Sequence, residues 1–167
     1  YVDEDVLRFD FHATENLDDS QLEEIQFNVN SIVKQWLDVV IKEMSYDDAL
    51  AHWAKAFFEE KYGDVVRVVK CTNESWFHSV ELCWWTHVAN TAHIGAFMIT
   101  KYESVASWIK RIEAVTGTNV ADHAQELSDR LSSIAWLLWS QRTHIEPKIQ
   151  KILDEQDQQH VLIEKIV

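Results

Sequence analysis

The sequence predicts an α+β fold: a largely antiparallel sheet with packed helices, followed by a C-terminal helical hairpin. In the first two thirds of the chain, short runs that alternate apolar and polar residues are interleaved with runs of helical spacing. In the last third, only helical spacing remains. We therefore expect an α+β domain over residues 1–118 and a helical hairpin tail over residues 119–167.

The first half of the domain is expected to run strand, helix, strand, helix. Leu7, Phe9 and Phe11 alternate with polar residues, as in a half-buried strand. Asp18 or Asp19 is expected to cap the helix that follows. A strand over residues 37–44 precedes a second helix over residues 46–61, where Ser45 and Asp48 are spaced as a capping box. The remaining strands are expected at residues 65–69, 79–83, 96–101 and 109–115.

The tail is expected to contain two helices with one apolar face each. The apolar residues at helical spacing are Leu127, Leu131, Ile134, Leu137, Leu138, Ile149, Ile152, Leu153 and Ile163. Thr143 and Glu146 are spaced as a capping box, and Pro147 suits the first turn of a helix. Trp136 and Trp139 are three residues apart, so we expect them on one side, in the core or the hairpin interface. If they are exposed instead, the pair would be an anchor for a partner.

Composition limits the classes of function. The formal charge of -13 opposes binding of a polyanion, because proteins grip phosphates with Lys and Arg. Two cysteines are too few for a disulfide framework. The first residues are acidic, unlike a signal peptide, and no apolar run is long enough to span a bilayer. We expect a cytoplasmic protein with no membrane partner.

Glycine and tryptophan are present in inverted proportion. The chain has three glycines and eight tryptophans, whereas average usage makes glycine roughly 7% of a chain. This inversion is the most informative feature of the composition.

Four segments, in order, resemble the editing domain of alanyl-tRNA synthetases, the second additional domain of these class II synthetases. The segments are residues 7–11 (LRFDF), 62–69 (YGDVVRVV), 79–95 (SVELCWWTHVANTAHIG) and 104–117 (SVASWIKRIEAVTG). The helical tail is similar to the segment that follows this domain in the same enzymes.

The resemblance implies an aminoacyl-tRNA deacylase, a hydrolase that releases serine or glycine from mischarged alanine tRNA. In the family, zinc is held by a His-x-x-x-His pair together with the Cys and His of a Cys-x-x-x-His segment. Cys83 and His87 occupy the latter two positions, and Thr86 and Asn90 are expected to line the substrate pocket. The upstream His pair is not matched, so we expect zinc to be weakly bound or absent.

Bulky aromatic residues replace small or acidic ones at several family positions. Trp84 and Trp85 stand where the family has two glycines. The other replacements are at Trp53, Trp76 and Trp108, where the family has glycine, and at Tyr102, where it commonly has glutamate. Because glycine permits torsions that a Cβ forbids, these replacements are expected to alter the cleft.

Two functional hypotheses follow. The first is a fragment or variant of the editing domain that acts on alanine tRNA, with impaired hydrolysis. The alternative is a degenerate or engineered protein-binding module, in which Trp and Tyr side chains form a partner or self-association surface. The proposed surface consists of Trp53, Trp76, Trp84, Trp85, Tyr102 and Trp108.

Several other polar residues have two interpretations. Lys101, Lys110 and Arg111 are either RNA contacts or a solvated strand edge. A replacement metal site would draw on His12, His52, His78 or His93, although scattered histidines are more often surface residues. Glu81 and Glu113 are candidates for supporting roles or strand pairing rather than catalysis.

Overall fold

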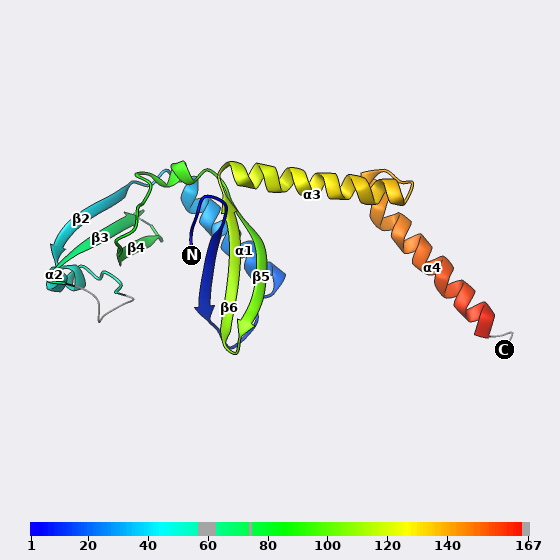
Figure 1. Ribbon diagram of the computed structural model, residues 1–167, viewed down its shortest axis with the longest axis horizontal. Helices are drawn as coiled ribbons and strands as arrows, with labels where there is room; N and C mark the ends of the chain where they lie inside the picture. The colour runs from blue at the N-terminus through cyan, green and yellow to red at the C-terminus, as the bar shows by residue number, and fades with distance from the viewer. Residues whose placement is uncertain (57–62, 74, 165–167) are drawn as a thin grey trace. The chain divides into compact units, whose positions relative to one another are not determined.

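The computed structural model describes residues 1–56, 63–73 and 75–164, and these divide into two compact units, Tyr1–Val120 and the chain from Ala121 onward. The α+β fold class is confirmed (Figure 1). The elements are β1 (Leu7–His12), α1 (Asp19–Val33), β2 (Val39–Ser45), α2 (Tyr46–Ala51), β3 (Val65–Thr72), β4 (His78–Leu82), η2 (Thr91–Ile94), β5 (Phe97–Ala106), β6 (Ile109–Thr116), α3 (Thr118–Leu137), η3 (Arg142–His144) and α4 (Ile145–Glu164). None of the helices described is long and apolar enough to cross a membrane.

The strands form two antiparallel sheets rather than the single sheet expected from the sequence. One has the order β1-β6-β5 and the other β2-β3-β4 (Figure 1). Phe9 pairs with Ile112 in the first sheet, and Val68 pairs with Leu82 in the second. Local patterns in the sequence predicted each strand but not which strands would become neighbours.

Helix α1 is attached to the first sheet through two side-chain amides. Asn30 Nδ2 donates to the carbonyl oxygen of Phe97 at 2.7 Å, and Asn30 Oδ1 accepts from the Phe97 N–H at 3.0 Å. Gln26 Oε1 accepts from the N–H of Ile99 at 2.8 Å. These amides satisfy backbone groups at the edge of β5 that a further strand would otherwise have to pair.

The expected helix caps at the start of α1 and α2 are present. Asp18 forms a capping box with Gln21, and Ser45 accepts from the N–H of Asp48 at 3.1 Å. Thr143, in contrast, does not cap α4: it lies within η3, where its hydroxyl contacts His144 at 2.9 Å.

Helix α2 ends earlier than expected. It was predicted to extend to Lys61, but it stops at Ala51; residues 57–62 of the predicted helix lie outside the described residues. Trp53 takes a left-handed conformation, and Lys55 then pairs with β4 through its N–H to Val80 and its carbonyl to Leu82. Pairing with the sheet edge competes with continuation of the helix, and in this structure the chain pairs with the sheet.

A hydrophobic core lies on one face of the second sheet. Val66, Val68, Val80 and Leu82 are buried there beneath Ala49 of α2. In the first sheet, Ile112 is buried and Phe97 is half-buried. Phe9, predicted to lie in a half-buried strand, is 59% exposed because it lies on the edge strand β1.

The second unit contains the two expected helices, but their apolar faces are open. Leu127, Leu131, Ile134, Ile149, Ile152 and Leu153 are each between 40% and 49% exposed. Burial is concentrated around the turn, at Ala135 and Ile145. Trp136 and Trp139, expected in the core or the hairpin interface, are instead 74% and 91% exposed.

Replacing Leu82 with Ala should lower the free energy of unfolding by about 2–5 kcal/mol, because it leaves a cavity in the core of the second sheet. The matched control is Leu50→Ala on the exposed side of α2, which should cost less than about 0.5 kcal/mol. Urea unfolding of both variants measures the difference. Equal costs would contradict this assignment of the core.

Candidate functional site

A cavity of about 280 Å³ lies over one face of the β2-β3-β4 sheet. Because strand side chains alternate between faces, β4 and the residue after it place Ser79, Glu81 and Cys83 on the same side. The cavity is lined by Ile32, Val39, Val69, Cys71, Phe77, Ser79, Glu81, Cys83, His87, Val88, Thr91 and Ile94. It is therefore mostly apolar, with a few polar groups.

Cys83 and His87 line this same cavity. Cys83 directly follows β4 and is half-buried, and its N–H donates to the carbonyl oxygen of Arg67 at 3.1 Å. His87 is exposed in the loop that leads to η2. The two residues selected from the sequence thus come from different local structures and border one space.

The backbone between Cys83 and His87 is held by Arg67. Its Nη1 donates to the carbonyl oxygen of Cys83 at 2.9 Å and to that of Trp85 at 2.5 Å. Sequence reasoning missed this contact. The available signal was a single Arg between valines in a predicted strand, in which Val66, Val68 and Val69 are buried.

The other polar groups of the cavity are partly occupied by internal contacts. Ser79 Oγ donates to Glu81 Oε1 at 3.0 Å. Thr91 is 5% exposed; its Oγ1 accepts from the N–H of Leu37 at 2.9 Å and donates to the carbonyl of Ile32 at 3.2 Å. Thr91 is consequently structural, whereas Glu81 and His87 keep groups that can reach a ligand.

Cys71 also borders the cavity, and it is not joined to Cys83. Both thiols are free. In the β3–β4 ladder, Cys71 is opposite Ser79, whereas Cys83 lies beside Arg67. Burial raises the pKa of the Cys71 thiol, and the nearby negative charge of Asp38 raises it further. Cys71 is therefore disfavoured as a thiolate at neutral pH.

Thr86 and Asn90, predicted to line the substrate pocket, are not among the residues that border this cavity. The side chain of Asn90 holds the loop together instead. Its Nδ2 donates to the carbonyl of Trp36 at 2.8 Å and to Asp38 Oδ1 at 2.9 Å. Its Oδ1 accepts from the N–H of Ala92 and caps η2. Thr86 is exposed in the loop between Cys83 and His87.

The donor set does not fit a resident zinc ion. A zinc site requires three or four protein ligands, and the described residues contain no group of three or more His, Cys, Asp or Glu placed to hold a metal. His52 and His78, considered as replacement ligands, line a separate hollow of about 570 Å³ formed by the opposite face of the same sheet. His12 and His93 do not border the Cys83–His87 cavity either.

The tryptophans proposed as a partner surface are all exposed. Trp53 and Trp85 are 85% and 80% exposed, and Trp76, Trp84 and Trp108 are between 58% and 61% exposed. They occupy turns and loops of different elements in both sheets. Tyr102 differs from them: it is half-buried, and its hydroxyl accepts from the N–H of Leu17 at 2.9 Å.

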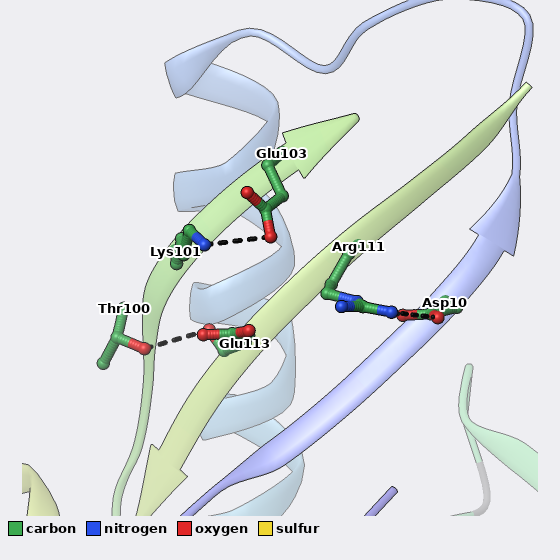
Figure 2. A network of polar contacts seen from close by, with 6 residues as sticks. All are labelled: Asp10, Thr100, Lys101, Glu103, Arg111 and Glu113. Carbon is green, nitrogen blue, oxygen red and sulfur yellow. Dashed lines mark hydrogen bonds and ion pairs between the residues drawn. The ribbon is translucent and has the colours of Figure 1, made fainter. Parts of the chain in front are cut away.

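The basic residues considered for RNA contact are engaged with other side chains. Figure 2 shows Arg111 bound to both carboxylate oxygens of Asp10, at 2.7 and 2.8 Å, and Lys101 beside Glu103 at 2.9 Å. Lys110 is buried, and its Nζ donates to Asn16 at 2.6 Å and to Ser104 at 2.7 Å. These contacts favour strand residues over RNA contacts, although Lys110 and Arg111 lie on the central strand β6 rather than on the solvated strand edge that was predicted.

Comparison with known proteins gives a consistent result. Residues 66–113 match the family described as the threonyl and alanyl tRNA synthetase second additional domain. The chain is 40% identical to the alanine-tRNA ligase of Fervidobacterium nodosum over 149 residues, 89% of this chain. It is 40% identical to that of Prochlorococcus marinus and 42% identical to that of Desulfosudis oleivorans, each over 154 residues, 92% of this chain. The chain spans 17% of the length of each of these relatives.

Replacing Arg111 with Gln should raise the pKa of Asp10. The hydrogen bond from Arg111 is the main reason that the pKa of this carboxyl lies below its ordinary value. Because that pKa is depressed, the stabilisation is present above the unfolded-state pKa and is lost as the pH falls through the folded-state pKa. An NMR titration of the carboxyl carbon measures the change. Arg130→Gln, which breaks a pair with Glu126, is the control and should leave Asp10 unchanged.

Proposed function

We propose that this chain, which is homologous to a segment of alanine-tRNA ligases, supplies the Cys-His part of an editing site that hydrolyses mischarged alanine tRNA. The single observation that carries the proposal is that Cys83 and His87 border one small cavity. Their spacing matches the Cys-x-x-x-His segment of the editing domain.

The size of the cavity supports a small ligand. Its volume of about 280 Å³ lies just below the range of small-molecule sites, roughly 300–1,000 Å³. A seryl or glycyl group fits such a space, whereas a nucleoside needs additional room outside it. We therefore assign the cavity to the aminoacyl group, with the terminal ribose at its mouth.

Hydrolysis of an ester requires a group that accepts a proton from water and donors that stabilise the oxyanion. His87 and Glu81 bring an imidazole and a carboxylate to the cavity. No step is assigned to zinc, because Cys83 and His87 alone do not complete a zinc site. With two of the family's ligands unmatched, we expect this chain to hydrolyse its substrate slowly or not at all.

Affinity for tRNA would come from outside this chain. Its formal charge is -13, and the basic residues near β5 and β6 are engaged with Asp10, Glu103, Asn16 and Ser104. A nucleic acid binds a protein strongly when Lys and Arg side chains replace its counterions. We propose that the chain provides the chemistry at the 3′ end while other parts of a longer ligase hold the tRNA.

A protein-binding module is the alternative function, and the exposure of the tryptophans favours it. All five tryptophans at family glycine positions are more than half exposed, and exposed Trp side chains are frequent anchors at interfaces. Tyr102 contributes little to such a surface, because it is half-buried and bonded to the backbone at Leu17.

The purified chain should carry much less than one equivalent of zinc, because Cys83 and His87 supply only two ligands. Elemental analysis after gel filtration in metal-free buffer measures the content, and Cys83→Ser/His87→Ala serves as the background control. One full equivalent in the parent and none in this variant would contradict the assignment of an incomplete donor set.

Incubation with serine-charged alanine tRNA should show little deacylation above the spontaneous rate, for the same reason. The cavity should nevertheless bind a non-hydrolysable seryl-adenosine analogue, measured by isothermal titration calorimetry. His87→Ala should weaken this binding, whereas His78→Ala on the opposite face of the sheet is the matched control.

These two measurements separate the parts of the proposal. A clear, Cys83-dependent rate would show that the donor set is more complete than the described residues indicate. Failure of the seryl analogue to bind, with both variants folded, would contradict the assignment of the cavity to an aminoacyl group.

A further inference from the structure

The left-handed region of the backbone is occupied by only two residue types in the described part of the chain. Gly95 and Gly117 have φ of 76° and 60°. The other residues with positive φ are all tryptophans: Trp36 at 55°, Trp53 at 63°, Trp108 at 66° and Trp139 at 50°. Asn and Asp, which tolerate this region better than other side chains do, do not occur there among the described residues.

These four tryptophans occupy the places where folds use glycine. After α2, the N–H of Trp53 donates to the carbonyl of Leu50 at 2.9 Å, and that of Ala54 donates to Ala49 at 3.1 Å. After α3, Trp139 and Ser140 repeat the pattern with Trp136 and Ala135, at 3.0 and 2.9 Å. Both are Schellman motifs, whose left-handed position is usually glycine because a Cβ is unfavourable there.

The other two positions follow the same rule. Trp36 comes just after α1, and its N–H donates to the carbonyl of Val33 at 3.3 Å. Trp108 lies in the turn between β5 and β6, where positive φ again favours glycine. A large aromatic residue is among the least suited to this conformation.

Exposure extends the pattern to all eight tryptophans. Each is between 58% and 91% exposed, although tryptophan is on average a highly buried residue. A fold with glycine at a position has no cavity for a side chain there, so an indole at that position projects into solvent. The chain has only three glycines. Two of them, Gly95 and Gly117, occupy positive-φ positions, and the remaining positive-φ positions among the described residues hold tryptophan.

We infer that the protein made in the cell has glycine at these tryptophan positions. The printed sequence translates one codon as tryptophan, whereas the cells that make the protein decode that codon as glycine. Independent mutations would not convert glycine to the same bulky residue in the turns of both units. A single reassigned codon does so everywhere at once. UGA, which different genetic codes assign to stop, tryptophan or glycine, is the codon that fits.

The consequence for the site rests on the proposed function. With glycine at positions 84 and 85, the backbone held by Arg67 between Cys83 and His87 carries no indoles. A ligand then meets peptide groups at the rim of the cavity instead of two aromatic side chains. The aromatic surface of the alternative function would not exist in the cellular protein.

Stability tests the inference without reference to activity. The quadruple variant Trp36→Gly/Trp53→Gly/Trp108→Gly/Trp139→Gly should melt about 5–10 °C above the parent, because each change relieves a left-handed Cβ. The same four positions changed to Ala form the matched control, which removes the indoles but keeps the Cβ. Trp84→Gly/Trp85→Gly, where φ is not positive, should change the melting temperature little.

Direct identification completes the test. The gene should carry UGA at these positions, and mass spectrometry of the endogenous protein should find glycine in the peptides that contain positions 53, 84, 85 and 108. Tryptophan in those peptides, or a quadruple glycine variant no more stable than its alanine control, would overturn the inference. Loss of seryl-analogue binding with glycine found in the peptides would count against the proposed function alone.

Discussion

The arrangement of the molecule depends on chain reversals in the left-handed conformation. Helices α1, α2 and α3 are each followed, within three residues, by a residue in this conformation, and the β5–β6 hairpin turns through another. Each reversal fixes what comes next: after Trp53 the chain pairs with β4, and after Trp108 it enters β6. A side chain at these points adds steric cost without adding packing, since the backbone path is set by hydrogen bonds that any residue could donate.

The candidate site inherits its geometry from the second sheet. Strand alternation places Ser79, Glu81 and Cys83 over the cavity. Arg67, in the adjacent strand, fixes the carbonyl groups of Cys83 and Trp85. His87 borders the cavity because the loop after Cys83 returns toward η2. Hydrogen bonds from Asn90 to Trp36 and Asp38 hold that loop in place. The site is thus a strand end with its loop pinned at two points.

Local patterns in the sequence predicted most elements but few of their partners. Capping at Asp18 and Ser45, alternation in β1 and the strand-forming runs of β3, β4 and β6 are properties of adjacent residues, and these predictions were correct. The division into two sheets and the amide contacts of Asn30 with β5 join residues far apart in the chain, so no local pattern reveals them. The early end of α2 was missed for a different reason: tryptophan at position 53 gives no stop signal, whereas glycine there would.

The same lesson applies to the site. Cys83 and His87 were identified by the resemblance, and Glu81 follows from strand alternation. Asn90 was predicted to line the pocket because it lies in the matching segment. In the structure, its side-chain amide forms hydrogen bonds within the loop. Position in a motif identifies a segment; which member faces the ligand depends on hydrogen bonds that form only in the fold.

The tryptophans connect the two functional hypotheses, because each hypothesis needs a different property of the same side chains. An interface anchor needs exposure and a fixed, supported position. A glycine site needs only a backbone conformation and empty space, and any side chain placed there projects outward. The exposed fractions agree with both requirements, but the φ values at residues 36, 53, 108 and 139 agree only with the second. Selection for binding has no reason to place indoles where the backbone is least tolerant of them. The backbone therefore favours the editing-domain interpretation, with the aromatic residues as replacements for glycine and Cys83 and His87 at an otherwise open rim.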